Sequence, residues 1–266
     1  MTDTAAVRPE VDADIARELA IAAARRLLEN RAENPDVGGK ALKDLGDQGA
    51  QEVLAARLAE LAPGDAVLSE EAADSDARLG ADRVWIIDPL DGTREYSEGR
   101  DDWAVHIALV VKGELSLGAV ALGGPDEVLV SSELDGHAPA QEGRIRIAVS
   151  RSRAPELVQS VSASLDAELV PMGSAGVKIC SVVRGEADAY VHGGGQYEWD
   201  SAAPVAVARA AGLHTARLDG SELVYNQPNP YLPDLVVCRP ELRDEVMTSI
   251  RAALASQADG KEHGVR

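Results

Sequence analysis

The stretch WIIDPLDGT, residues 85–93, predicts a strand followed by a cation site. Its apolar first part predicts a buried strand that delivers two carboxylates, Asp88 and Asp91, at its carboxyl end. Two carboxylates and a turn carbonyl such as that of Leu90 are oxygen ligands of the kind that Mg²⁺ accepts. A plain acidic turn is the alternative. The strand before the turn and the threonine after it favour the metal site.

The end of the same stretch is suited to an anion. Pro89 stiffens the turn, and Gly92 allows a tight backbone and the close approach of a ligand. Thr93 is placed to open a short helix, whose free N–H groups attract negative charge. The sequence therefore places a candidate anion site beside the candidate cation site.

Acidic residues from two other segments are expected to reach the same corner. Glu70 follows the short apolar run Val67–Leu68, and it reaches Asp88 if the two strands are neighbours. Ligand sites of α/β sheets lie at the carboxyl ends of strands. Asp200 precedes a predicted helix, where a plain N-cap is the alternative role. In the functional interpretation, Asp200 also faces the metal corner.

The hydrophobic pattern divides the chain into two halves. Residues 1–140 predict an α+β half that carries most of the metal ligands, and residues 141–266 predict an α/β half. In the first half Asp47 is expected to cap a helix that starts at about Gln48. The expected helices and strands of the first half cover residues 11–29, 48–61, 67–68, 84–87, 104–111 and 115–121, with a hairpin turn at 112–114. Those of the second half include strands at 168–172, 187–192 and 236–238 and helices at 155–165, 175–184, 201–211 and 241–255.

The composition sets limits on partners and location. The 266 residues carry a net charge of −19, of which −16 falls in residues 1–140. This sign argues against binding a nucleic acid polymer or an anionic membrane surface. There is no signal peptide or spanning segment, and the two cysteines have no metal-type spacing, so we expect a cytoplasmic protein. The oligomeric state stays open, with a homodimer among the alternatives.

Three segments together resemble the magnesium-dependent, lithium-sensitive phosphatase superfamily that contains inositol monophosphatase. Residues 69–71 look like its Glu-Glu element, residues 88–93 like its DP(I/L)DGT signature, and residues 199–200 like its WD element. Their order and spacing agree with the superfamily over nearly the whole chain. The resemblance implies a layered α-β-α-β-α sandwich of two halves, as in inositol monophosphatase and fructose-bisphosphatase.

Within this superfamily the chain most resembles the CysQ type, the 3′(2′),5′-bisphosphate nucleotidases. The run SRSR at residues 150–153 is similar to their Ser-Arg-Ser-His stretch, and GSAGVK at 173–178 to their Gly-Ser-x-x-x-Lys stretch. This resemblance implies hydrolysis of the 3′-phosphate of adenosine 3′,5′-bisphosphate to AMP and phosphate, which removes a by-product of sulfur assimilation.

The resemblance also implies roles for single residues. Two or three Mg²⁺ ions, with Li⁺ as an inhibitor, would be held by Glu70, Asp88, Asp91, Asp200 and the carbonyl of Leu90. Glu70 and Thr93 would position the attacking water, and Asp47 would hold Thr93. The N–H groups of Gly92 and Thr93 would hold the scissile phosphate. Further substrate contacts are expected from Ser150, Ser152, Arg153, Lys178 and Asp200.

Departures from the superfamily pattern keep the substrate open. The usual threonine before Asp47 is missing, Arg153 replaces a histidine, and Gly193 stands where animal-type inositol monophosphatases carry a glutamate. Arg153 is able to grip a second phosphate instead. The alternatives are inositol phosphates or fructose 1,6-bisphosphate as substrates, or a metal-stabilised protein that binds nucleotide without turnover. The five scattered histidines are predicted not to bind metal.

Overall fold

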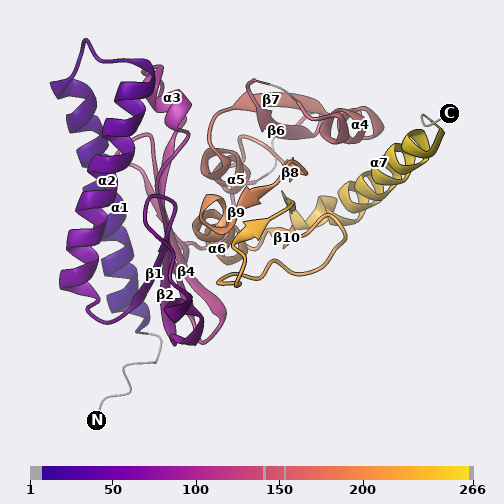
Figure 1. Ribbon diagram of the computed structural model, residues 1–266. Coiled ribbons are helices and arrows are strands. Elements are labelled where there is room, and N and C mark those ends of the chain that lie inside the picture. The colour runs from indigo at the N-terminus through magenta and orange to yellow at the C-terminus, as the bar shows by residue number, and fades with distance from the viewer. Residues whose placement is uncertain (1–7, 140–141, 153, 264–266) are drawn as a thin grey trace.

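Five layers alternate across the computed structural model, which describes residues 8–139, 142–152 and 154–263 (Figure 1). Helices α1 (Pro9–Glu33) and α2 (Gly39–Leu61) form the outer layer on the left. Next come a five-stranded sheet, a helical layer of α5 (Ala175–Val183) and α6 (Ala202–Ala210), and a second five-stranded sheet. Helices α4 (Glu156–Ser164) and α7 (Arg243–His263) form the last layer. The predicted α-β-α-β-α sandwich is therefore confirmed.

The first sheet has the strand order β1-β2-β3-β4-β5. Its strands are β1 (Ala66–Ser69), β2 (Arg83–Asp91), β3 (Ala104–Val111), β4 (Glu114–Leu122) and β5 (Val128–Val130). Short helices η1 (Asp76–Gly80), α3 (Thr93–Ser97) and η2 (Ser131–Glu133) connect or follow these strands. Strand β1 is parallel to β2, and the other neighbours are antiparallel. The alanine- and leucine-rich face of α1 packs on this sheet together with α2.

The second sheet has the strand order β10-β12-β8-β6-β7, and β9 and β11 form a separate ribbon. The strands are β6 (Arg146–Ser150), β7 (Glu168–Met172), β8 (Ala189–His192), β9 (Gln196–Tyr197), β10 (His214–Ala216), β11 (Tyr231–Leu232) and β12 (Leu235–Cys238). Short helices η3 (Glu198–Asp200) and η4 (Pro240–Leu242) precede α6 and α7.

The middle helical layer joins the two sheets in one hydrophobic core. Side chains of the first sheet, such as Val84 and Ile86, belong to the same buried cluster as Val205 and Val207 of α6. The contact is close, because a Cβ atom on Gly118 of β4 would lie only 2.3 Å from the carbonyl oxygen of Ala203. The two halves are thus held together by packing over a large area.

The start of α2 differs from the prediction. The helix begins at Gly39, so Asp47 lies inside it and does not cap it. Gly46 and Gly49 lie inside this helix and are packing contacts. A Cβ atom on Gly46 would lie 2.8 Å from the ring of Tyr96, and one on Gly49 would lie 2.3 Å from the amide of Asn30. Tertiary packing therefore outweighs the low helix propensity of glycine here.

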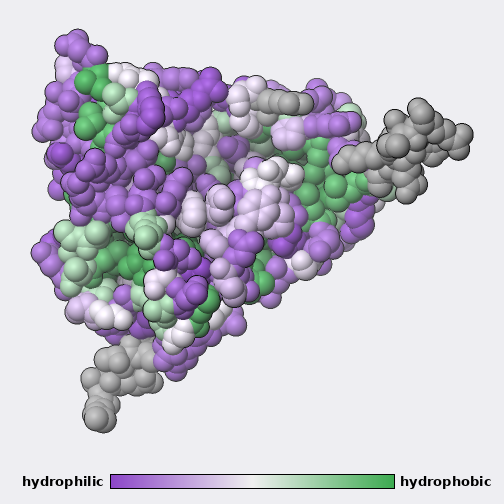
Figure 2. All heavy atoms as spheres, in the orientation of Figure 1, coloured by the Kyte–Doolittle hydropathy of each residue, from purple (hydrophilic) through white to green (hydrophobic). Residues whose placement is uncertain are grey.

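The face shown in Figure 2 is largely hydrophilic, which agrees with the high net charge. None of the described helices combines the length and the apolar character that crossing a membrane requires.

Candidate active site

The predicted acidic corner forms where strands β1 and β2 end side by side. Ser69 is opposite Ile87 in the parallel register, and the N–H of Glu70 donates to the carbonyl of Ile87 at 3.3 Å. This register sets Glu70 beside Asp88, where the charge of Glu70 contributes to the raised pKa of Asp88. Strand β2 continues through Pro89 to Asp91, with an irregularity in its pairing with β3 between Asp88 and Asp91. A proline without a donor is tolerated in a strand at such a point.

Three of the predicted ligands meet in space although they come from different halves. Asp88, Asp91 and Asp200 each offer a carboxylate oxygen, and these oxygens lie within 4.8 Å of one another. Asp88 and Asp91 are buried, and Asp200 is partly buried. Asp200 does not cap α6, because its carboxylate turns back to accept the N–H of Tyr197 at 2.6 Å. The plain helix-cap alternative for Asp200 is therefore wrong.

The electrostatics of this cluster fit a divalent cation. Burial, followed by the charges of Glu70 and Asp91, raises the pKa of Asp88 well above its usual value. Burial is also the main cause that raises the pKa of Glu70 and of Asp200 to about 7. Oδ2 of Asp88 is buried without a hydrogen-bond partner among the described residues. Buried acids are costly unless they are paired or bind metal, so the donor set fits Mg²⁺.

Asp91 is oriented by donors from the second half of the chain. The hydroxyl of Ser174 donates to Oδ2 of Asp91 at 2.5 Å, and the N–H of Gly176 donates to the same oxygen at 2.7 Å. Ser174 is the N-cap of α5, and its hydroxyl also accepts the N–H of Val177. Its backbone φ of 35° is strained for any residue other than glycine. The sequence analysis quoted this serine within a motif but assigned it no role.

His106 is a second neighbour of the acids that the sequence analysis did not assign. It is fully buried on β3, opposite Asp88 in the antiparallel register. Its Nδ1–H donates to the carbonyl of Trp199 at 3.0 Å, and its Nε2 lies 3.3 Å from Oδ2 of Asp91. Burial lowers the pKa of His106, whereas the charge of Asp91 raises it. Its Nε2 has no hydrogen-bond partner among the described residues, so the ring is anchored at Trp199 and lies against Asp91.

The turn after β2 has the geometry that its sequence predicts. Gly92 has a φ of 90°, in the left-handed region, and a Cβ atom there would lie 3.2 Å from Cβ of Ser174. The N–H of Leu90 donates to Asp88, and the hydroxyl of Thr93 is directed at the carbonyl of Leu90 at 3.4 Å. Helix α3 begins at Thr93, so free N–H groups are present at this point.

Asp47 is half-buried in α2 and lies near another acid. Burial, followed by the charges of Glu71 and Asp44, raises its pKa to about 7. Within the described ranges, no hydrogen bond joins Asp47 to Thr93. The expected role of Asp47 in holding Thr93 stays a prediction.

A cavity of about 420 Å³ adjoins Asp200. Its walls include Ser150, Lys178, Tyr190, His192, Tyr197 and Asp200. Lys178 is buried, and its Nζ donates to the carbonyls of Gly173 and Ser174 at 2.8 and 2.6 Å. The hydroxyl of Ser150 lies 3.1 Å from that of Ser152. Arg153 lies outside the described residues.

Comparisons with known proteins agree with this geometry. The sequence profile described as the inositol monophosphatase family matches residues 9–255. A Mycobacterium tuberculosis protein named 3′-phosphoadenosine 5′-phosphate phosphatase is 50% identical over 240 residues, which cover 87% of this chain and 90% of that protein. The Escherichia coli protein named 3′(2′),5′-bisphosphate nucleotidase CysQ is 34% identical over 200 residues, which cover 70% of this chain and 80% of that protein.

Solved structures of the same group share the fold. CysQ from Bacteroides thetaiotaomicron matches with a TM-score of 0.74 at 27% identity, over 87% of this chain and 98% of that chain. Inositol monophosphatase II from Staphylococcus aureus matches with a TM-score of 0.78 at 20% identity, over 95% of this chain and 98% of that chain. This chain belongs to the inositol monophosphatase family.

Proposed function

We propose that this protein is a Mg²⁺-dependent phosphatase that removes the 3′-phosphate of adenosine 3′,5′-bisphosphate and leaves AMP. The observation that carries the proposal is the buried cluster of Asp88, Asp91 and Asp200 beside a cavity of about 420 Å³. The substrate is supported by the 50% identity to a protein named 3′-phosphoadenosine 5′-phosphate phosphatase. A cavity of this volume is within the usual range for small-molecule sites.

In this proposal the acidic corner holds Mg²⁺ through the three aspartates, Glu70 and the carbonyl of Leu90. Bound Mg²⁺ offsets the negative charge of the phosphate and lowers the pKa of water. Ser174 and Gly176 keep the Asp91 carboxylate in a fixed orientation, since both donate to its Oδ2. Two or three ions at this corner agree with the size of the acidic set.

The other predicted residues have distinct tasks in the same proposal. Glu70 and Thr93 orient the attacking water, and Asp47 supports Thr93 from α2. The free N–H groups of Gly92 and Thr93 hold the scissile phosphate. Ser150 and Lys178 line the cavity that would take the nucleoside and its second phosphate. Ser152 and Arg153, which follow Ser150 in the sequence, are assigned to that second phosphate as well.

Gly193 supports a nucleotide over an inositol phosphate. In this chain a Cβ atom on Gly193 would lie 2.9 Å from a methyl group of Leu157. An acidic side chain at this position therefore needs its neighbours to move. The chain thus lacks, at residue 193, a carboxylate that would bind sugar hydroxyls. Inositol phosphates and fructose 1,6-bisphosphate remain the alternative substrates on the same metal site.

The test is a comparison of phosphate release rates by the purified protein in Mg²⁺. Adenosine 3′,5′-bisphosphate should be hydrolysed far faster than inositol 1-phosphate or fructose 1,6-bisphosphate, and chromatography should identify 5′-AMP as the product. Li⁺ should inhibit the reaction. Equal or reversed rates would refute the assigned substrate. Turnover of none of the three would favour a protein that binds nucleotide without hydrolysis.

We also propose a cytoplasmic location for this enzyme. Support comes from Cys180 and Cys238, which are both buried free thiols. Fractionation of the source cells tests the location, and light scattering of the purified protein tests whether it forms a homodimer.

A further inference from the structure

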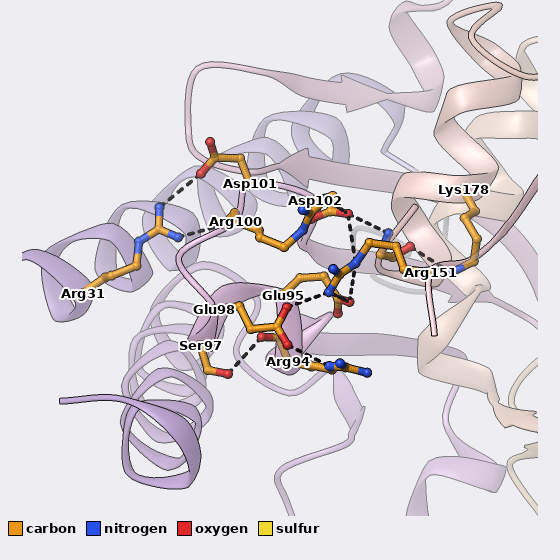
Figure 3. A network of polar contacts seen from close by, with 11 residues as sticks. Arg31, Arg94, Glu95, Ser97, Glu98, Arg100, Asp101, Asp102, Arg151 and Lys178 are labelled. Carbon is orange, nitrogen blue, oxygen red and sulfur yellow. Dashed lines mark hydrogen bonds and ion pairs between the residues drawn. The ribbon is translucent and has the colours of Figure 1, made fainter. Parts of the chain in front are cut away.

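Arg151 forms a bridge of ion pairs between the two halves of the chain. It follows β6, and its guanidinium points away from the second half into a group of carboxylates (Figure 3). Its Nη2 donates to Glu95 at 2.9 Å and to Glu98 at 2.7 Å, and its Nε lies 3.9 Å from Asp102. The Arg151 side chain is only 24% exposed. Networks of this kind fix geometry better than an isolated surface pair.

The same carboxylates also hold the turn that precedes α5. Oδ2 of Asp102 accepts the N–H of Gly173 at 2.8 Å. A Cβ atom on Gly173 would lie 2.4 Å from Cγ of Glu95, so this backbone is pressed directly on the glutamate side chain. Arg151 and Gly173 are therefore seated on one acidic surface, which we call the α3 clamp and define as Glu95, Glu98 and Asp102.

The turn held by the α3 clamp leads directly to the metal corner. Gly173 is followed by Ser174, whose hydroxyl donates to Asp91. Lys178 secures the same turn from behind, because its Nζ donates to the carbonyls of Gly173 and Ser174. A continuous series of contacts thus runs from Arg151 through the α3 clamp and Gly173 to Ser174 and Asp91.

The guanidinium of Arg151 is occupied by this network. The neighbouring Ser150 lines the cavity beside Asp200, whereas Arg151 faces the carboxylates of the first half. The broad hydrophobic core around α5 and α6 holds the two halves together without Arg151. Loss of Arg151 is therefore expected to loosen the turn at Gly173 locally, and to leave the fold intact.

We propose that Arg151 is a positioning residue for the metal site, acting through the α3 clamp on Ser174 and Asp91. This inference rests on the acidic corner being a Mg²⁺ site, as in the proposed function. Residues that orient a metal ligand from behind typically change metal affinity or activity by about 10–100-fold when they are replaced. Loss of the Arg151 contacts should therefore weaken Mg²⁺ binding.

Arg151→Met tests the proposal, because a simple field effect and positioning predict opposite signs. Removing a positive charge near an acidic site strengthens cation binding if only long-range electrostatics matter. Positioning predicts weaker binding. Because Arg151 acts on Asp91 through intermediate residues, the half-saturating Mg²⁺ concentration should rise by about 10-fold, the lower end of that range, in calorimetry. In metal-free protein, hydrogen exchange of segment 173–178 should become faster, while α4 exchanges as in the wild type.

Arg31→Met is the matched control. Arg31 lies 3.2 Å from Asp101 and donates to the carbonyl of Arg100, and among the described residues no hydrogen bond or ion pair joins it to the α3 clamp. Its loss removes an equal charge without breaking the bridge, so Mg²⁺ affinity should be unchanged or higher. Arg151→Lys keeps the charge but cannot fork between carboxylates, so it should weaken Mg²⁺ binding less than Arg151→Met does. If Arg151→Met does not fold, Arg151→Lys is compared with the wild type instead.

Several outcomes would overturn the proposal. Wild-type Mg²⁺ affinity together with unchanged exchange at 173–178 in Arg151→Met would show that the bridge is only a surface contact. An equal loss of affinity in Arg31→Met would show that Arg151 has no special role. Absence of Mg²⁺ binding in the wild type would show that there is no metal site for Arg151 to position. None of these measurements uses a substrate. Failure to hydrolyse adenosine 3′,5′-bisphosphate would therefore refute the proposed function. The measurements of Mg²⁺ binding and hydrogen exchange would still decide the role of Arg151.

Discussion

Two clusters of buried charge lie at opposite ends of strand β2, and they are built differently. At the first end, the guanidinium of Arg83 is 4% exposed and lies 2.7 Å from Asp12 and 3.0 Å from Asp65. At the other end, Asp88 and Asp91 meet Asp200, and within the described residues no arginine or lysine pairs with any of the three. Burial lowers the pKa of the nearest ring, that of His106.

The difference separates a structural cluster from a functional one. Buried charges of opposite sign compensate each other and add hydrogen bonds, so the Arg83 cluster is complete without a ligand. Like charges in the same kind of burial raise pKa values, as Glu70 does for Asp88 and Asp200 does for Glu70, and such carboxylates stay costly until a cation arrives. The distinction would be established if removal of a charge lowers the stability of the metal-free protein at the Arg83 end and does not lower it at the acidic end.

The largest effect is expected from Asp88→Asn. Metal ions supply several kcal/mol to phosphate ester hydrolysis, so phosphate release should fall by about a thousandfold or more. In EDTA the variant should be at least as stable as the wild type, because one of the repelling charges is gone. Initial rates and urea unfolding without metal measure the two effects. Retained activity would show that Asp88 is not part of the active site. A large loss of stability without metal would show that the buried carboxyl of Asp88 is not unfavourable in the metal-free protein.

At the other end of β2, Arg83→Met should destabilise the fold. Removing one partner of a buried ion pair leaves uncompensated charge and costs about 3–5 kcal/mol. Arg57→Met is the control, since its pairs with Glu18 and Glu60 are exposed and such pairs contribute about 1 kcal/mol or less. Urea unfolding of both variants gives the comparison. Similar losses in the two would show that the burial of Arg83 adds nothing.

Added Mg²⁺ should stabilise only proteins with an intact acidic corner. A ligand at a hundred times its dissociation constant stabilises the folded state by about 2.7 kcal/mol. The wild type and Arg83→Met should both gain this amount over their values in EDTA, and Asp88→Asn should gain much less. Thermal unfolding with increasing Mg²⁺ follows the effect. An equal gain in all three proteins would place the stabilising ions elsewhere.

The sequence predicted elements and residue types well because these depend on local pattern. Strand β7 covers the expected residues 168–172, and the hairpin turn has positive φ at Lys112 and Gly113. The predicted start of α2 was wrong because Asp47 is a favoured N-cap residue type, whereas the helix already begins at Gly39. The helix runs through Gly46 and Gly49, whose contacts with Tyr96 and Asn30 require glycine there. No local signal reports such contacts.

The acids of the candidate site could be predicted, but the residues that orient them could not. Asp88 and Asp91 belong to a sequence motif. Their proximity to Glu70 follows from the single assumption that strands β1 and β2 are neighbours. His106 requires the register of β2 against β3, which sets it opposite Asp88. Ser174 reaches Asp91 only because α5 packs between the sheets. These partners depend on tertiary structure, which one sequence does not reveal.

The finest test of the comparison is the dependence of metal-free stability on pH. Burial raises the folded-state pKa of Glu70 from 4.5 to about 7, so folded protein holds a proton that the unfolded chain releases between these values. The contribution of this proton to the free energy of unfolding is fully present below pH 4.5. It is lost as the pH rises towards 7, by at most about 1.4 kcal/mol per pH unit.

Urea unfolding in EDTA across this range should therefore show a wild type that loses stability relative to Glu70→Gln as the pH rises. Glutamine has the same size but does not titrate, so the difference between the two proteins isolates this carboxyl. In saturating Mg²⁺ the loss should disappear from the wild type, because the carboxylate is then compensated as Asp12 is by Arg83. A difference that does not vary with pH in EDTA would mean that Glu70 is charged without metal. The contrast between the two ends of β2 would then apply to the aspartates alone.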